Sequence, residues 1–158
     1  MQDLGDKIEV RKTKKGKSIF SIKDFTKDEI ILEFENNFLD YPGKYTLCID
    51  INKHQYSIDA NAHEKFINHS CNPNGYINFQ DLTCRALRLI KKGEEITFNY
   101  LTTEWDLANK FDCECGSLKC HGRIKGFKYL TLEQQKELGP FLSLFLRKKL
   151  NTILKGIK

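Results

Sequence analysis

The sequence predicts a mainly β fold that ends in an amphipathic helix, and three observations support this class. Short runs rich in β-branched and aromatic residues, separated by turn-forming residues, fill the first hundred positions. The apolar pattern then changes to a helical period, because leucines recur every four residues at 142, 146, 150 and 154. The length of 158 residues suits one domain of ordinary size.

The β-rich runs predict where strands lie along the chain. We expect strands at residues 8–13, 18–22, 29–34, 44–51, 55–59, 83–90 and 95–100. Turn residues separate them, at Lys14-Lys15-Gly16, at Asn52-Lys53-His54 and at Lys91-Lys92-Gly93. The fourth and fifth strands should therefore form a hairpin.

The C-terminal part carries helix signals. Thr131-Leu132-Glu133-Gln134 has the spacing of a capping box, which predicts that a helix follows. The leucine stripe after Gly139-Pro140 predicts a second helix with one apolar face. We expect this face to pack on the β part rather than on a membrane or on a second copy.

Composition and charge limit the function classes. Hydrophobic residues make up 40% of the chain, charged residues make up 30%, and no run approaches the ~20 apolar residues of a membrane span. Residues 1–17 are polar, so we expect no signal peptide and an intracellular protein without a membrane partner. Whether it is cytoplasmic or nuclear stays open, as does its oligomeric state.

The charge is distributed unevenly. Residues 31–115 carry eight basic and thirteen acidic side chains, which suits a lysine-rich protein or peptide as partner. Residues 116–158 carry ten basic and two acidic side chains. This basic C-terminal part fits either contact with nucleic acid or a solvated helix face.

Six cysteines need an explanation other than disulfides if the chain is intracellular, where thiols stay reduced. Cys113, Cys115 and Cys120 crowd into eight residues and supply three of the four ligands that structural zinc takes. Either Cys71 or His121 could supply the fourth, and we favour Cys71, because His121 directly follows a ligand. The remaining two, Cys48 and Cys84, lie in apolar runs and should be core thiols.

The segment Asn68-His69-Ser70-Cys71-Asn72-Pro73-Asn74 concentrates hydrogen-bonding side chains beside a proline. Such a segment suits a tight loop that grips a polar ligand, although by itself it is more often a structural turn.

Three blocks together resemble the SET-domain protein lysine methyltransferases. They are the Asn68–Asn74 segment, the run Gly93-Glu94-Glu95-Ile96-Thr97-Phe98-Asn99-Tyr100 and the cysteine cluster, in family order, with Lys15-Gly16-Lys17 similar to the family's first glycine turn. The resemblance covers roughly residues 8–125 and implies a fold of small sheets with a threaded pseudoknot. It also implies a SET domain at 1–108, a post-SET zinc segment at 109–126 and a C-terminal helical extension at 127–158.

The resemblance implies S-adenosylmethionine as methyl donor, a structural zinc ion and methyl transfer to a lysine side chain. The implied cofactor-binding residues are Lys15, Gly16, Lys17, Lys65, Asn68, His69, Tyr100 and Phe111. Tyr100 matches the catalytic tyrosine, Tyr45 matches a tyrosine of the lysine channel, and Phe98 matches the position that sets the product. The implied zinc ligands are Cys71, Cys113, Cys115 and Cys120.

Phenylalanine rather than tyrosine at position 98 implies di- or trimethyl-lysine as the product. The substrate is expected to be a lysine-rich protein or peptide, with histones among the options. Ser18, Lys65 and Asn99 replace the glycine, arginine and aspartate common in the family. Two other functions stay open, a catalytically silent zinc-stabilised binding module for protein or nucleic acid, and methyl transfer to a non-protein amine.

Overall fold

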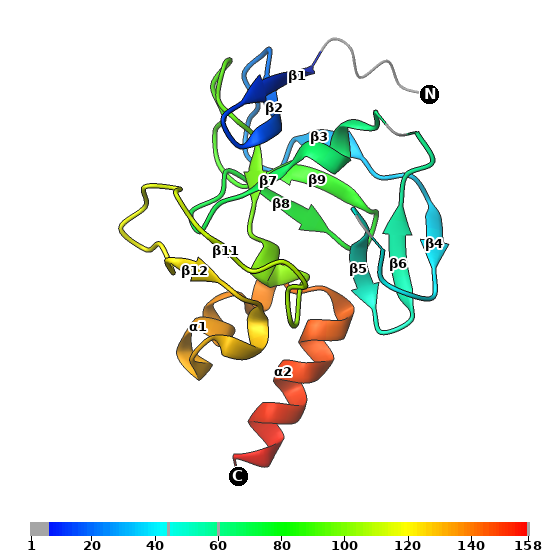
Figure 1. Ribbon diagram of the computed structural model, residues 1–158, viewed down its shortest axis with the longest axis vertical. Helices are drawn as coiled ribbons and strands as arrows, with labels where there is room; N and C mark the ends of the chain where they lie inside the picture. The colour runs from blue at the N-terminus through cyan, green and yellow to red at the C-terminus, as the bar shows by residue number, and fades with distance from the viewer. Residues whose placement is uncertain (1–6, 44, 60, 158) are drawn as a thin grey trace.

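The computed structural model describes residues 7–43, 45–59 and 61–157. Small sheets make up most of it, and two α-helices gather at the end of the molecule that carries the C-terminus (Figure 1). The predicted class, a mainly β fold of small sheets with a C-terminal helix, is confirmed.

The N-terminal hairpin follows the predicted alternation. β1 (Ile8–Thr13) and β2 (Gly16–Ser21) pair antiparallel without a register shift, and Thr13 lies opposite Gly16. The turn Lys14-Lys15 therefore closes directly onto Gly16, whose φ of 104° lies in the region that glycine tolerates. This geometry places Lys15 at the tip of the hairpin.

Two three-stranded sheets form the middle of the molecule, side by side in Figure 1. The first has the order β3–β9–β8, made of Ile30–Glu33, Thr83–Ala86 and Gly75–Asn78. The second has the order β4–β6–β5, made of Asn37–Leu39, Lys53–Tyr56 and Leu47–Asp50. All pairs within them are antiparallel.

Two shorter pairings connect distant parts of the chain. β7 (Asn68–His69) runs parallel to β10 (Thr97–Phe98). β11 (Phe111–Asp112) pairs antiparallel with β12 (Arg123–Ile124). Short 3₁₀-helices fill several connections, η2 (His63–Phe66), η3 (Tyr100–Thr102), η4 (Phe127–Tyr129) and η5 (Gly139–Phe141).

Several predicted boundaries are wrong. The hairpin turn falls at Ile51-Asn52, because Asp50 pairs with Lys53, so His54 belongs to β6 and not to the turn. The strand expected at 83–90 ends at Ala86, and the one expected at 95–100 is reduced to β10. β4 and β8 were not expected, because their runs are short and rich in Asn and Gly.

Apolar side chains form two separate cores. The larger core fills the β part, with Ile19, Phe25 and Ile31 fully buried in it. The smaller core lies in the C-terminal extension, where Phe127 and Leu146 are fully buried. Each core removes several large side chains from water, and each such side chain contributes about 1.5–3 kcal/mol.

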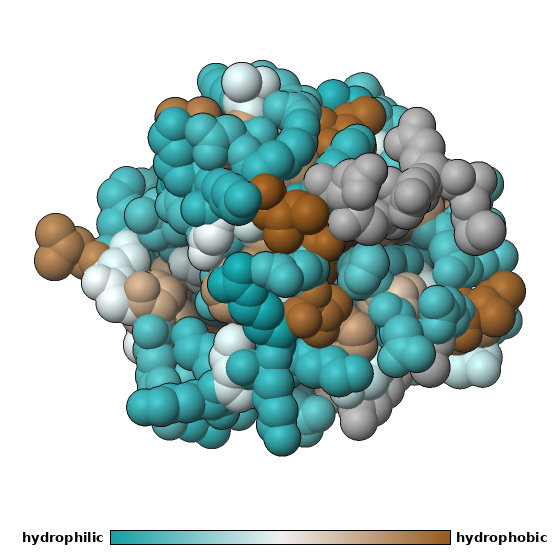
Figure 2. Space-filling view, turned by 90° about the horizontal axis from the view of Figure 1, so that it is seen from above, coloured by the Kyte–Doolittle hydropathy of each residue, from teal (hydrophilic) through white to brown (hydrophobic). Residues whose placement is uncertain are grey.

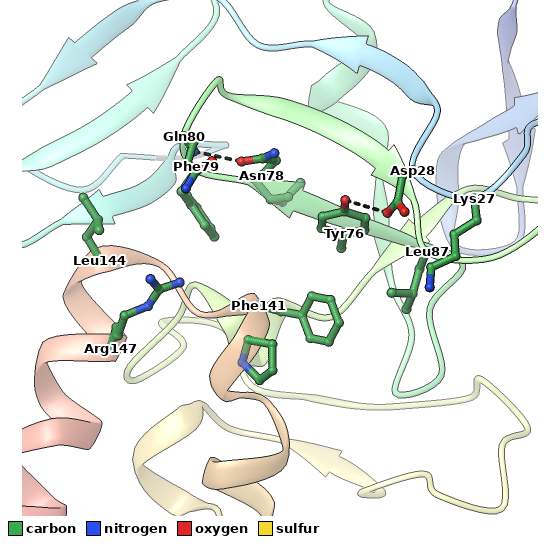
Figure 3. A pocket seen from close by; sticks show the side chains of 12 residues that line it. Lys27, Asp28, Tyr76, Asn78, Phe79, Gln80, Leu87, Phe141, Leu144 and Arg147 are labelled. Atoms are coloured by element: carbon green, nitrogen blue, oxygen red, sulfur yellow. Dashed lines mark hydrogen bonds between the residues drawn. The ribbon is translucent and has the colours of Figure 1, made fainter.

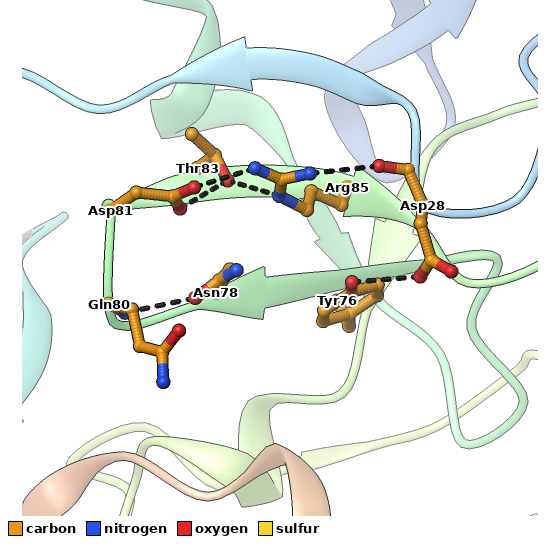
Figure 4. A network of polar contacts seen from close by, with 7 residues as sticks. All are labelled: Asp28, Tyr76, Asn78, Gln80, Asp81, Thr83 and Arg85. Carbon is orange, nitrogen blue, oxygen red and sulfur yellow. Dashed lines mark hydrogen bonds and ion pairs between the residues drawn. The ribbon is translucent and has the colours of Figure 1, made fainter.

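A polar network fixes the edge of the first sheet (Figure 4). The guanidinium of Arg85 on β9 donates to the Asp81 carboxylate at 2.6 Å and to the Asp28 carbonyl at 3.1 Å. The Tyr76 hydroxyl on β8 donates to the Asp28 carboxylate at 3.0 Å. These bonds tie β8 and β9 to the connection that precedes β3.

The two α-helices begin where their caps predict. Thr131 and Gln134 form a complete capping box at the start of α1 (Leu132–Glu137). Ser143 caps α2 (Leu144–Gly156), so Leu142 of the predicted stripe precedes the helix instead of lying in it. Helix α2 contacts β5, and Lys148 pairs with Asp50. The leucines of its apolar stripe are instead buried with Phe127 in the smaller core, so the apolar face packs mainly within the C-terminal part and not, as expected, on the β sheets.

The face of the molecule at the β1–β2 hairpin is largely hydrophilic (Figure 2). Seen from the end that carries the β1–β2 hairpin, hydrophobic groups appear as separate small areas among hydrophilic ones (Figure 2). Within the described ranges, no helix has the length and apolar character needed to span a membrane.

Candidate active site and metal centre

The site begins at the parallel contact between β7 and β10. Asn68 lies opposite Thr97, and His69 lies opposite Phe98. Asn74 holds the contact in place, because its side-chain carbonyl accepts from the Thr97 N–H at 3.0 Å and its amide donates to the Glu95 carbonyl at 2.8 Å. Segments about thirty residues apart in sequence are thus joined through short strands and one buried asparagine.

Asn68 connects this contact to the N-terminal hairpin. Its side-chain amide donates to the Ser18 hydroxyl at 2.7 Å, to the Glu95 carboxylate at 3.1 Å and to the Lys17 carbonyl at 3.3 Å. The side chain is therefore fixed by groups of β2 and of the segment before β10. Ser18 acts here through its hydroxyl, which a glycine at this position would lack.

His69 and Tyr100 form the centre of the site. The Tyr100 backbone N–H donates to Nδ1 of His69 at 3.1 Å, and the Tyr100 hydroxyl donates to the Ile67 carbonyl at 2.9 Å. Burial, with the charges of Glu104 and Glu95, raises the pKa of Tyr100 to about 12, so the hydroxyl stays protonated at neutral pH. The site therefore presents a neutral hydroxyl in a fixed position.

Aromatic rings surround this pair. The ring of Phe98 lies 5.0 Å from that of Tyr100, and the ring of Phe111 lies 5.6 Å from the His69 ring. A cavity of about 250 Å³ opens between the hairpin tip, β7 and β11, and it is lined by Lys15, Asn68, His69, Tyr100, Phe111, Asp112, Cys113 and Glu114. Five of the predicted cofactor-binding residues thus line one cavity.

The cysteine cluster adjoins the cavity. The sulfur atoms of Cys71, Cys113, Cys115 and Cys120 all lie within 4.8 Å of one another. A Zn–S bond of about 2.3 Å places tetrahedral sulfurs about 3.8 Å apart, and the Cys71 and Cys113 sulfurs are 3.8 Å apart. The donor set therefore fits a zinc ion held by four thiolates.

The surroundings of the cluster act differently on its thiols, because burial raises the pKa of Cys71 and of Cys113 whereas that of Cys115 is lowered. The backbone N–H groups of His121 and Gly122 point at the sulfurs of Cys71 and Cys120, each at 3.4 Å. Burial works to raise the pKa of Cys115, but the backbone N–H of Ser117 and the neighbouring thiols outweigh it and lower that pKa to about 6. His121 contributes this backbone contact and is not a member of the cluster.

Other predicted site residues lie outside the cavity wall. Gly16 and Lys17 follow Lys15 in the hairpin, and the Lys17 carbonyl reaches Asn68. The Lys65 ammonium donates to the Asp59 carbonyl at 2.6 Å. Tyr45 is 59% exposed and does not line this cavity.

Cys48 and Cys84 are buried, as predicted for core thiols. Burial raises the pKa of each to about 12, which leaves both as neutral thiols at physiological pH.

Sequence reasoning missed several residues that build the site. Asn74 lies in the Asn68–Asn74 segment, but its role depends on β10. Asn99 caps η3 by accepting from the Leu101 N–H at 3.0 Å, so the asparagine performs the capping role of an aspartate at this position. Glu104 comes one helical turn after Tyr100 and carries no motif of its own.

A second cavity, of about 490 Å³, lies elsewhere on the molecule. Figure 3 shows its lining side chains, which come from β8 and the turn after it, from η5 and α2, and from the loop residues Lys27, Asp28 and Leu87. Within the described chain, its lining includes no predicted catalytic, cofactor-binding or metal-binding residue. The smaller cavity beside Tyr100 is therefore the candidate active site.

The chain is similar to known proteins in sequence and in fold. The chain is 28% identical to human Histone-lysine N-methyltransferase 2B over 66% of its length, and 40% identical to Methyltransferase flvH of Aspergillus flavus over 39%. It spans only 5% and 35% of these relatives. A structure of KRYPTONITE in complex with mCHH DNA, H3(1-15) peptide and SAH matches the fold with a TM-score of 0.58 at 22% identity, over 73% of this chain and 29% of that one.

The family model of the SET domain matches residues 11–101. This range contains β1 to β10 apart from the first residues of β1, and it includes both segments that meet at the Asn74 contact. Because the match covers more than half of the chain, the protein belongs to the SET domain family.

Proposed function

We propose that the protein transfers a methyl group from S-adenosylmethionine to the side-chain amine of a lysine in a protein substrate. The single observation that supports this most directly is the cavity beside the Tyr100 hydroxyl, whose wall combines Asn68, His69 and Phe111. Polar groups and an aromatic ring suit a cofactor that carries an amino acid end and an adenine. The relatives' names, which include histone-lysine N-methyltransferase, point to the same reaction.

The residues of the chain would act mainly by placement. The cofactor supplies an activated sulfonium methyl, so the gain in rate comes from aligning the amine with it. Asn68, fixed by three hydrogen bonds, and the ring of Phe111 would hold opposite ends of the cofactor. The protonated Tyr100 hydroxyl, held by the Ile67 carbonyl, would orient the attacking amine.

Zinc would hold the cavity wall together. Cys113 lines the cavity, and Cys71 lies two residues after His69. One ion bound by all four thiolates would therefore join the segment at 109–126 to β7 and its His69. We propose the three-part organisation at 1–108, 109–126 and 127–158 on this basis.

The product is proposed to be di- or trimethyl-lysine. Phe98 and Tyr100 have rings 5.0 Å apart, and Phe98 is buried. A phenylalanine offers no hydroxyl to hold the methylated amine or a water molecule, so the amine can turn and present its lone pair again. Phe98 is also a core aromatic of β10, and the product measurement below separates the two roles.

The substrate is proposed to be a lysine-rich protein, with histone H3 as the first candidate. The acidic charge of residues 31–115 favours a basic peptide. One structure of similar fold contains an H3(1-15) peptide by its title. The basic charge of residues 116–158 supports an additional contact with nucleic acid.

The test uses methyl-labelled S-adenosylmethionine with an H3(1-15) peptide, with a fractionated lysate and with free lysine. We expect label on lysine side chains, a mixture that progresses to di- or trimethyl-lysine with excess cofactor, and loss of most turnover in Tyr100→Phe with cofactor binding retained. Cofactor binding without transfer to any acceptor would instead identify a silent binding module. A product that stops at monomethyl-lysine would show that Phe98 does not set the product.

Transfer to a non-protein amine is the second candidate. The 40% identity to flvH is compatible with it, because the name of that protein specifies no acceptor. Label on free lysine and none on protein would favour this candidate.

A further inference from the structure

Glu104 occupies a fixed position four residues after Tyr100. Its backbone N–H donates to the Tyr100 carbonyl at 3.0 Å, and its own carbonyl accepts from the Phe127 N–H at 2.8 Å. The 3₁₀-helix η3 ends at Thr102, and Thr103 has a φ of −125° and a ψ of −30°, so helical spacing does not set the direction of the Glu104 side chain. The two backbone hydrogen bonds hold Glu104 next to Tyr100.

The Glu104 carboxylate is close enough to Tyr100 and to Cys48 of β5 for its charge to act on both groups. Burial raises the pKa of the Tyr100 hydroxyl and of the Cys48 thiol, and this charge raises both further. Cys48 does not line the cofactor cavity, and neither does Glu104. Glu104 therefore approaches Tyr100 from a side other than that cavity.

This carboxylate lacks a cationic partner in the chain. Its one hydrogen bond is a long one of 3.4 Å from the Thr103 hydroxyl, and in the described ranges no Lys, Arg or His forms an ion pair with it. Burial raises the pKa of the Glu104 carboxyl. A desolvated carboxylate without a partner costs free energy.

Asp106, two residues further on, shows the contrast. It is solvent-accessible, and its carboxylate pairs with Lys110 at 3.0 Å and with Lys128 at 2.6 Å. The hydrogen bonds from Lys128 and Lys110 lower its pKa to about 2. The solvated carboxylate of Asp106 therefore has two lysine partners, whereas the carboxylate of Glu104, beside Tyr100, has none in the described part of the chain.

We propose that the Glu104 carboxylate is the binding site for the substrate amine. It would pair with the protonated amine of the incoming lysine side chain and hold the nitrogen next to the Tyr100 hydroxyl. The missing cation of the chain would then be supplied by the substrate. This inference rests on the proposed function, because it assigns the amine to the same tyrosine.

The same pair provides a route for the proton that must leave before attack. One N–H bond of the ammonium breaks and an O–H bond forms on Glu104, which converts two buried charges into two neutral groups. The freed lone pair then forms the C–N bond while the S–C bond of the methyl donor breaks. The other groups that face Glu104 are neutral at physiological pH, the Tyr100 hydroxyl and the Cys48 thiol, and nearby Asp50 already pairs with Lys148.

Binding of two small probes tests the recognition step. N-acetyl-lysine methylamide and N-acetyl-norleucine methylamide have the same chain, but only the first has an amine. With S-adenosylhomocysteine bound, we expect wild type to favour the lysine probe and Glu104→Gln to lose at least about tenfold of that preference. Glu104→Asp should keep part of it, and Asp106→Asn is the matched control that should keep all of it.

The rate of methyl transfer against pH tests the proton step. Without the carboxylate, the amine must lose its proton to water, so kcat/KM of Glu104→Gln should rise about tenfold per pH unit toward the lysine pKa of ~10.4. Wild type and Asp106→Asn should be flatter over pH 7–9.

An unchanged lysine preference in folded Glu104→Gln, or equal binding of both probes by wild type, would overturn the proposal. A wild-type preference that depends on Glu104 in a protein with no methyl transfer would leave this inference standing and refute the proposed function.

Discussion

Two buried histidines differ in their hydrogen bonding, one at the β7–β10 contact and one in the β4–β6–β5 sheet. His69 of β7 is 8% exposed and His54 of β6 is 6% exposed. Nδ1 of His69 accepts from the Tyr100 N–H, and its Nε2 lies 3.3 Å from the Cys71 sulfur. Neither ring nitrogen of His54 has a hydrogen-bond partner among the residues that the structure describes.

The difference separates a histidine that positions other groups from one that only fills space. At the β7–β10 contact, each nitrogen of His69 contacts a neighbour, and the neighbours are the Tyr100 backbone and the Cys71 thiol. In the β4–β6–β5 sheet, the His54 ring lies between Leu39 of β4 and Cys48 of β5 in the register and donates to neither. Equal burial therefore has opposite consequences for stability, because a buried polar atom costs free energy only when it lacks a partner.

Loss of the metal should be the largest effect on the His69 region. We expect one zinc per chain, and Cys71→Ala or a chelator should release it. Structural zinc in small sites contributes on the order of 10 kcal/mol, so its removal should detach the segment at 109–126 from β7 and weaken cofactor binding. Metal analysis and calorimetry measure both quantities.

Cys84→Ala is the control, because this buried thiol lies outside the cluster, and it should keep its zinc. Freshly purified, active protein without zinc would contradict the expectation.

Substitution of His69 should come next in size. His69→Phe keeps a ring in the same place but leaves the Tyr100 N–H without an acceptor, which should lower the free energy of unfolding by about 1–3 kcal/mol. The rate of methyl transfer should fall more than the loss of folded protein alone would cause, because Tyr100 loses a hydrogen bond that positions it. Denaturant unfolding and single-turnover rates, compared with those of His54→Phe, provide the measurement; equal effects at both positions would remove the distinction.

The sequence predicts these two regions unequally, for a physical reason. The Asn68–Asn74 segment and the cysteines form a local pattern that regular strands lack, so this part of the site could be predicted from the residues themselves. Lys15, Tyr100 and Phe111, which also line the cavity, were predicted only from the family resemblance. His54 was expected in a turn, because a short strand with consecutive buried polar residues, His54 and Gln55, has no period-two signal.

Glu104 was missed for a different reason. The role proposed for Glu104 depends on its desolvation and on the lack of a cationic side chain beside its carboxylate, and only the folded structure shows these. The N-terminal hairpin was the easiest element to predict, because the run 8–13 alternates cleanly and ends at a lysine-glycine turn.

The Tyr100 hydroxyl is a second polar group, partly buried, that has a hydrogen-bond partner, and its ionisation can be measured. Its pKa of about 12 in the folded state exceeds the ordinary value of 10, so the folded state binds more protons than the unfolded state between these limits. Stability associated with this hydroxyl is complete below pH 10 and is lost as the pH rises toward 12, about 1 kcal/mol at pH 11.

Urea unfolding between pH 9 and 11 should therefore show a steeper loss for wild type than for Tyr100→Phe. Parallel curves for the two proteins would show that the hydroxyl is not held as the structure describes.

Substitution of His54 should have the smallest effect, and the sign should differ from that at His69. Both ring nitrogens of His54 are buried without partners, and a phenylalanine of similar shape removes two desolvated polar atoms and keeps the packing between β4 and β5. Replacing an unpaired polar group with an apolar one of the same shape is nearly neutral or stabilising, so we expect His54→Phe to lie between no change and a gain of about 1 kcal/mol. Zinc content, cofactor binding and methyl transfer should stay at wild-type levels, because no site residue hydrogen-bonds to this ring. A loss of more than about 1 kcal/mol would mean that the ring has a partner, such as a bound water, and that the two histidines differ less than their contacts indicate.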